Sequence, residues 1–194
     1  KLERHATTNE TVIRGLGEMH LRAKLARLAS QYKVELATKP PQIDYRETIT
    51  GKAPGHCRHK KQSGGAGQFG EVMLRVEPLP RGGGFEFVDE VKGGAIPGVF
   101  MASVEKGVRQ ALADGIVGGF PVSDVRVIVY DGKSHAVDSK DIAFFTAGRK
   151  AVIEAVRAAT PIILEPIVDI EILAPESAVG DLSGDLSGKR GQIT

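Results

Sequence analysis

The sequence has no tryptophan, one cysteine and few aromatic residues, which make up 5% of its 194 positions. A single cysteine, Cys57, cannot form an internal disulfide and suits a reducing compartment, so we expect a cytoplasmic protein. No apolar run approaches the roughly 20 residues that span a bilayer, and no signal peptide is visible at Lys1, so we expect neither secretion nor a membrane partner. The net charge is only +2, which excludes a general basic field as the basis of nucleic-acid binding.

What the chain does have is enough apolar sequence for a folded core. With 41% hydrophobic residues it can bury roughly 70% of its unfolded surface, in one large domain or in pieces of two or three. Its ends are abrupt, because the first ten residues are polar without an initiator methionine and Gln192, Ile193 and Thr194 begin a strand pattern that does not continue. We therefore expect an excerpt of a longer protein.

Hydrophobic spacing divides the chain into three parts. The first part, to about Tyr45, has a strand pattern at Thr11–Arg14, then an amphipathic helix, then a strand pattern at Val34–Ala37. The apolar face of that helix consists of Leu21, Leu25, Leu28 and Tyr32. The last part starts near Glu165 and has a strand pattern at Val168–Ile172, followed by a helix pattern from Pro175 to Arg190 that Gly191 closes.

The long middle part opens at about Arg46 and mixes strands with helices. Its strand patterns lie at Val72–Val76, Phe85–Val91 and Val125–Tyr130, and its helix patterns run from about Pro97 to Ala113 and from about Asp141 to Ala159. The elements intermingle without heptads or a fixed repeat. The sequence therefore predicts an α+β fold of small sheets with helices packed on one face.

The segment Lys60–Gly70, KKQSGGAGQFG, places two lysines beside a glycine-rich loop. Gly65, Gly67 and Gly70 fit the dinucleotide fingerprint GxGxxG, but that fingerprint needs a strand before it and a helix after it. A strand pattern follows instead, in which Val72, Leu74 and Val76 alternate with Met73 and Arg75. This context excludes a nucleotide site and predicts the basic tip of a hairpin.

Other catalytic and metal-binding patterns are also incomplete. Gly132, Lys133 and Ser134 are the last letters of a phosphate-binding P-loop, yet the required earlier glycine falls on Val127. Asp131, Ser134 and His135 are too close in one loop for the geometry of a hydrolytic triad.

Histidines elsewhere give no stronger signal. His56, Cys57 and His59 look like metal ligands, but neighbours on a strand point to opposite faces and no second ligand pair exists, so a surface strand with a buried cysteine is favoured. His20 lies on the polar flank of the first helix, where an ordinary packing or surface role is expected.

Two loops remain as candidates, residues 64–70 and 131–139. One interpretation is that glycine and charge simply mark solvated turns. The other is contact with RNA, in which cations neutralise phosphates, glycines let backbone amides approach, and polar side chains form hydrogen bonds. The cations are Arg58, Lys60, Lys61 and Lys133, the polar groups are Gln62, Gln68 and His135, and Phe69 is the one candidate for base stacking. If the flanking strands are neighbours, both loops lie at the same end.

Eight stretches of the sequence, in order over essentially the whole chain, resemble elongation factor G, the ribosomal translocase. They are GLGEMHL at Gly15–Leu21, PQIDYRETI at Pro41–Ile49, QSGGAGQFG at Gln62–Gly70, GFEFVDEVKGGAIP at Gly84–Pro97, VEKGVRQAL at Val104–Leu112, YDGKSHAVDS at Tyr130–Ser139, LEPIVDIEI at Leu164–Ile172 and GDLSGKRGQI at Gly184–Ile193.

This resemblance implies three domain pieces. Residues 1–45 correspond to the second half of the family's third domain, 46–164 to a complete fourth domain with a left-handed βαβ crossover, and 165–194 to the start of a ferredoxin-like fifth domain. Both flanking pieces are then partial ferredoxin-like domains. The GTP-binding domain would lie outside this chain, so we expect no enzymatic activity or cofactor here, and GTP and magnesium in the missing N-terminal domain.

In this family the fourth domain is the arm that enters the decoding region of the small ribosomal subunit in place of the moving transfer RNA. The resemblance implies ribosomal RNA, transfer RNA and messenger RNA as partners, with the family's tip histidine at His135. The implied contact residues are Lys60, Lys61, Gln62, Ser63, Gly64, Gly65, Ala66, Gly67, Gln68, Phe69, Gly70, Asp131, Gly132, Lys133, Ser134, His135, Asp138 and Ser139.

The chain departs from the family at the tip. Ala66 stands where many members have arginine and Glu71 where histidine is common, which lowers the expected positive charge. The segment also resembles divergent paralogues of elongation factor G, so the alternative is a protein that binds, recycles or regulates ribosomes without efficient translocation. Incomplete sheets at both ends predict that the fragment self-associates through exposed strand edges.

Overall fold

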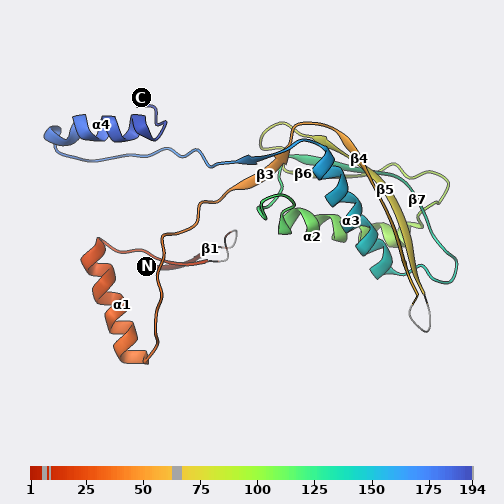
Figure 1. Ribbon diagram of the computed structural model, residues 1–194, viewed down its shortest axis with the longest axis horizontal. Helices are drawn as coiled ribbons and strands as arrows, with labels where there is room; N and C mark the ends of the chain where they lie inside the picture. The colour runs from red at the N-terminus through yellow and green to blue at the C-terminus, as the bar shows by residue number, and fades with distance from the viewer. Residues whose placement is uncertain (6–7, 9, 63–66, 194) are drawn as a thin grey trace.

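A four-stranded sheet forms the centre of the computed structural model, which describes residues 1–5, 8, 10–62 and 67–193 (Figure 1). The strands lie in the order β4 (Ala53–Lys61), β5 (Gln68–Pro78), β7 (Val125–Lys133) and β6 (Phe85–Asp89). β5 runs antiparallel to both β4 and β7, whereas β6 is parallel to β7. Helices α2 (Gly98–Asp114) and α3 (Asp141–Ala158) pack on one face, which confirms the α+β prediction.

The core lies between this sheet and the two helices. Every second residue of a strand points to the same face, and the valines at alternate positions of β5 and β7 are fully buried. α3 presents alanines to the sheet, so its backbone comes close: a Cβ on Gly55 of β4 would lie 2.1 Å from the Ala151 carbonyl oxygen. Small residues on both elements therefore set the distance between α3 and β4.

A crossover connects the two parallel strands, because α2 lies between β6 and β7 in the chain. This is the βαβ unit that the resemblance implies, and its left hand stays a prediction. No helix among the described residues is long and apolar enough to cross a membrane.

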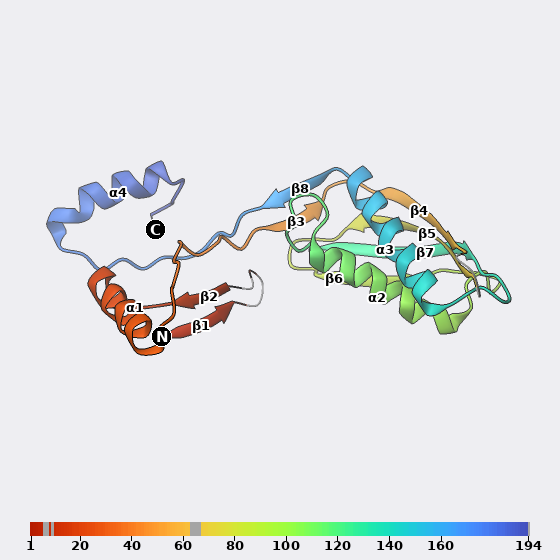
Figure 2. The same cartoon turned by 60° about the horizontal axis from the view of Figure 1, so that its bottom comes forward.

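A second, two-stranded sheet lies at the base of the central body, where Figure 2 shows β3 (Arg46–Ile49) beside β8 (Pro161–Leu164). The strand that begins at Pro161 was not predicted. β3 and β8 pair antiparallel, from Arg46 opposite Leu164 to Ile49 opposite Pro161. Arg46 and Leu164, at the predicted boundaries of the middle part, thus lie opposite each other at one end of this sheet.

The first part of the chain contains β1 (Leu2–His5), β2 (Glu10–Ile13) and helix α1 (Glu18–Tyr32). The predicted strand at Val34–Ala37 is wrong: its residues are in no sheet, and Val34 and Leu36 are 47% and 45% exposed. The following segment is held beside β2 by Glu10, which pairs with Lys39 and accepts a hydrogen bond from the Gln42 N–H. Side-chain contacts replace the expected backbone ladder.

The last part contains a short 3-10 turn, η1 (Glu176–Ala178), and helix α4 (Val179–Gly188), which together confirm the predicted helix. The predicted strand at Val168–Ile172 is wrong, because these residues are exposed and no described strand pairs with them. Gln192 and Ile193 also form no strand, and Thr194 lies outside the described residues. Alternation alone indicated strands here, but a strand also needs a partner.

Candidate nucleic-acid interface

The described residues of the two predicted loops, 67–70 and 131–139, meet at the end of the central body that lies away from β3 and β8 (Figures 1 and 2). Strand register brings them together, since Lys61 of β4 is opposite Gln68 of β5, and Glu71 of β5 is opposite Lys133 of β7. A parallel bridge between Phe69 and Ser139 continues this contact beyond the strands. For the described residues, the prediction that both loops lie at one end is therefore confirmed.

Most of the predicted contact residues that the structure describes surround one cavity of about 270 Å³. Its predicted members are Lys60, Lys61, Gln62, Gly67, Gln68, Phe69, Lys133, Ser134, His135 and Asp138, and Arg58 joins them. Gly70, Asp131, Gly132 and Ser139 are not part of its lining. The predicted residues Ser63, Gly64, Gly65 and Ala66 lie outside the described residues.

The charge of this cavity is positive. Lys60, Lys61 and Lys133 are exposed, and no carboxylate of the described residues lies within ion-pair distance of them. Arg58 is more constrained, because its guanidinium lies 5.4 Å from the centre of the Phe69 ring and 3.8 Å from a Glu71 oxygen. Three exposed ammonium groups and one shared guanidinium can neutralise phosphates.

Phe69 is held in place and is only half-exposed. Its ring lies 6.1 Å from the His135 ring in a tilted arrangement, and Arg58 covers one side. Its N–H donates to the Asp138 carbonyl oxygen at 2.8 Å. Such a ring supports its neighbours more directly than it offers an open face for base stacking.

His135 makes hydrogen bonds that fix its ring. Its Nδ1 accepts from the backbone N–H groups of Val137 and Asp138 at 3.3 and 3.2 Å, and its own backbone N–H donates to Ser139 Oγ at 2.8 Å. Because Nδ1 is an acceptor, the neutral ring carries its proton on Nε2. Among the described residues no hydrogen bond joins His135 to Asp131 or Ser134.

The described glycines of the two loops, which were expected to let RNA approach, have packing roles. A Cβ on Gly67 would lie 2.8 Å from Asp138 Cγ, one on Gly70 would lie 3.1 Å from the Ala143 backbone of α3, and one on Gly132 would lie 2.3 Å from the Glu71 carbonyl oxygen. The Gly67 N–H also donates to Asp138 Oδ1 at 3.1 Å. These glycines let one part of the protein approach another.

Glu71 does not face the cavity as a free negative charge. It is 5% exposed, and its Oε1 lies 2.8 Å from His56 Nε2 on the neighbouring strand.

The described residues contain no group of three His, Cys, Asp or Glu side chains that could hold a metal ion. Cys57 is half-buried on the core side of β4, and burial raises the pKa of its thiol.

Glu47 of β3 was not predicted from the sequence, and it places a charge that is only 1% exposed at the base of the central body. Its carboxylate accepts hydrogen bonds from the N–H groups of Ile116, Val117, Gly118 and Phe120. Burial raises the pKa of Glu47, but the four N–H groups lower it by more, so the net pKa lies below its ordinary value. The strand reads RETI and is largely polar, so nothing in the local sequence indicated that Glu47 is buried.

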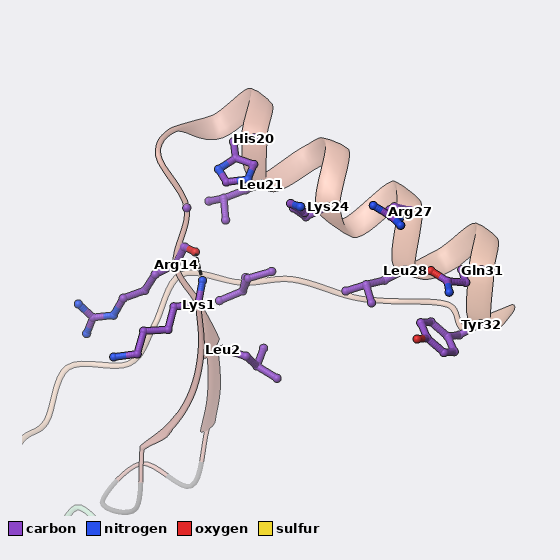
Figure 3. A pocket seen from close by; sticks show the side chains of 12 residues that line it. Lys1, Leu2, Arg14, His20, Leu21, Lys24, Arg27, Leu28, Gln31 and Tyr32 are labelled. Carbon is purple, nitrogen blue, oxygen red and sulfur yellow. Dashed lines mark hydrogen bonds between the residues drawn. The ribbon is translucent and has the colours of Figure 1, made fainter.

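A different hollow lies between β1–β2 and α1 and has a volume of about 400 Å³ (Figure 3). Apolar side chains from both sides line it, including Leu2, which is 69% exposed, and Tyr32, which is 63% exposed. The one hydrogen bond drawn there joins the amino group of Lys1 to the Arg14 carbonyl oxygen. This hollow is an uncovered side of a small sheet, and the residues described around it form no convergent set of reactive groups.

Comparisons with known proteins agree with this architecture. Residues 41–160 match the family described as "Elongation factor G, domain IV", and residues 1–40 match "Elongation Factor G, domain III". The chain is 49% identical over 185 residues to an "Elongation factor G-like protein" of Thermotoga maritima and 48% identical over 186 residues to "Elongation factor G" of Aquifex pyrophilus. These matches cover 95% and 96% of this chain but 27% of each relative.

A solved structure of a Thermus thermophilus protein superimposes with a TM-score of 0.87 and 41% identity, over all of this chain and 29% of that one. The sheet with its paired tip loops and these matches define part of a translation elongation factor. The chain belongs to the elongation factor G family. It spans about a quarter of the length of the relatives it matches, and the predicted domain limits at residues 45 and 164 stay predictions.

Proposed function

We propose that the central part of this chain is the arm of a ribosomal translocase, whose tip contacts transfer RNA and messenger RNA in the decoding region. The observation that carries the proposal is the cavity at the tip, where exposed lysines from β4 and β7 surround His135. Membership of the elongation factor G family supports the ribosome as the partner.

The tip is suited to contacts with the RNA backbone. Ammonium groups neutralise phosphates without reading sequence, and the Nε2–H of His135 donates to a phosphate or ribose oxygen. Few aromatic residues are available to stack bases, which fits recognition by shape. In this role the arm holds the transfer RNA and its codon after movement, so that they do not slip back.

In this proposal, GTP and magnesium bind to another domain of the full-length parent. The parent acts in the cytoplasm, where the ribosomes are. The arm itself then performs no chemistry. GTP turnover elsewhere drives or gates its insertion, and the tip converts insertion into directional movement. The predicted self-association of the fragment through strand edges is separate from this role and stays a prediction.

The proposal is tested by His135→Ala in the full-length parent. We expect translocation on reconstituted ribosomes to slow by about tenfold or more, because a charge-assisted hydrogen bond is lost, while GTP hydrolysis stays near the parental rate. His20→Ala on α1 is the matched histidine control and should translocate normally. Unchanged translocation in His135→Ala would remove the assigned role of the tip.

The second candidate is a paralogue that binds or recycles ribosomes without efficient translocation. The chain is about as similar to a relative named "Elongation factor G-like protein" as to one named "Elongation factor G", and this supports the second candidate as much as the first. The same reconstituted assay on the unmodified parent separates them, since a paralogue of this kind would bind ribosomes and hydrolyse GTP without moving the transfer RNA.

A further inference from the structure

Three hydrogen bonds join the β4–β5 hairpin to the loop between β7 and α3. The Gly67 N–H donates to Asp138 Oδ1 at 3.1 Å, the Phe69 N–H donates to the Asp138 carbonyl oxygen at 2.8 Å, and Ser139 Oγ donates to the Phe69 carbonyl oxygen at 3.1 Å. We refer to these contacts of Gly67, Phe69, Asp138 and Ser139 as the clasp. They connect residues about 70 positions apart in the chain.

The clasp is continuous with the bonds that orient His135. The Asp138 N–H donates to His135 Nδ1, and the His135 backbone N–H donates to the same Ser139 oxygen that donates to Phe69. The ring is thereby fixed with Nδ1 toward its own loop, and no described residue is a hydrogen-bond partner of Nε2. The clasp and the position of the Nε2–H donor therefore form one network.

The charge of Asp138 makes its placement informative. A carboxylate at the edge of a cavity lined by lysines opposes RNA binding by simple electrostatics. Yet the carboxylate points inward. Its Oδ1 accepts from the Gly67 N–H, in space that exists because residue 67 has no side chain, and its Oδ2 lies 3.5 Å from His135 Nδ1. Its contribution to the interface is then the geometry of the two loops, which keeps the lysines of β4 and Lys133 of β7 around one cavity.

We propose that Asp138 and Ser139 are positioning residues, which hold the two tip loops as one RNA-binding unit and keep His135 as an Nε2–H donor, instead of touching RNA themselves. This inference rests on the proposed function for its RNA readout. It changes the role that family resemblance gave these two residues, from direct contact to support of their neighbours.

Two substitutions at one position separate positioning from charge. Asp138→Asn removes the negative charge but keeps an oxygen that accepts from the Gly67 N–H, whereas Asp138→Ala removes both. If Asp138 were only a surface charge, both variants would bind RNA about twofold to threefold more tightly than the unmodified chain. If it positions the loops, Asp138→Ala binds about threefold to tenfold more weakly than Asp138→Asn, because the cross-loop hydrogen bond is lost.

The experiment uses the 194-residue chain and a fluorescein-labelled RNA stem-loop with a single-stranded loop, with Kd measured by anisotropy over a range of salt. The free chain is also examined by long-range ¹H–¹⁵N NMR, which reports the tautomer of His135 without any RNA. We expect Nε2–H in the unmodified chain and in Asp138→Asn, and a mixture of tautomers in Asp138→Ala. Ser139→Ala should change both readouts in the same direction as Asp138→Ala.

Binding of Asp138→Ala as tight as that of Asp138→Asn would overturn the positioning role, as would an unchanged His135 tautomer in Asp138→Ala. If the unmodified chain shows no salt-dependent RNA binding, the proposed RNA contact fails instead. The tautomer measurement then still decides whether the clasp fixes His135, so the two failures are distinguishable.

Discussion

The buried carboxylate of Glu47 should be among the most costly side chains of the chain to change. Five contacts of 2.7 to 3.1 Å join its two oxygens to the N–H groups of Ile116, Val117, Gly118 and Phe120. These groups connect β3 to the loop after α2, at the base of the arm. We predict that Glu47→Gln and Glu47→Ala both destabilise the central part of the chain.

The magnitude follows from the number of donors that lose their acceptor. Each buried N–H without a partner costs about 1–3 kcal/mol, and the costs do not add fully because the loop relaxes. Glutamine keeps one acceptor oxygen but turns an NH₂ group toward N–H donors, so we expect a loss of about 2–4 kcal/mol. Alanine leaves all four donors unpaired and should cost about 3–5 kcal/mol, a large share of the roughly 5–15 kcal/mol typical of a domain.

Urea unfolding followed by circular dichroism measures this loss. Because the folded pKa of Glu47 lies below the unfolded value of 4.5, its stabilisation is present above pH 4.5 and is lost as the pH falls through the folded pKa. Glu47→Gln should remove that part of the acid sensitivity. The control is Glu105→Gln on α2, whose i,i+4 pair with Arg109 contributes at most about 0.5 kcal/mol. A loss below about 1 kcal/mol in Glu47→Gln would refute this reasoning.

Two further predictions concern the tip and the core. Replacing Lys60 and Lys61 together by alanine should make RNA binding by the chain less sensitive to salt. The slope of log K against log salt should fall in magnitude by roughly 1.4 to 1.8, because each phosphate contact contributes about 0.7 to 0.9. The control is Lys106→Ala, which changes an exposed lysine on α2 and should leave the slope unchanged. Gly55→Ala should lower stability by about 1–3 kcal/mol in thermal unfolding, since the added Cβ meets the α3 backbone at Ala151, and a neutral result would show that α3 moves away at little cost.

The central elements could be predicted from the sequence because each has a strong local pattern. Buried valines alternate in β5 and β7, and the apolar residues of α2 and α3 recur at helical spacing. The patterns at Val34–Ala37 and Val168–Ile172 are locally of the same kind, yet neither segment has a pairing partner among the described residues. Alternating apolar residues show which side of a strand would be buried. Whether the strand forms depends on hydrogen bonding to a neighbouring strand.

At the candidate site, the sequence predicted that the two loops lie at one end of the sheet, but it did not predict which way their side chains point. Neighbouring strands brought the two loops together as expected. The inward turn of Asp138 depends on strand register, and that register includes a bulge where Tyr130 is an extra residue between the partners of Met73 and Leu74. A single inserted residue changes which side chains face a neighbour, so contacts such as the clasp follow from the folded sheet alone.

The near-neutral net charge conceals how unevenly charge is distributed over the central sheet. On the face away from the helices, cations are matched by carboxylates: Lys52 with Glu77, Arg75 with Glu90, and Arg126 with Glu86. These exposed pairs contribute little stability, but they cancel the local field along most of the sheet. At the tip the matching stops, and Lys60, Lys61 and Lys133 have no described carboxylate within ion-pair distance. A polyanion approaching this face of the sheet therefore meets unpaired ammonium groups at its far end, which is where the proposed function requires contact.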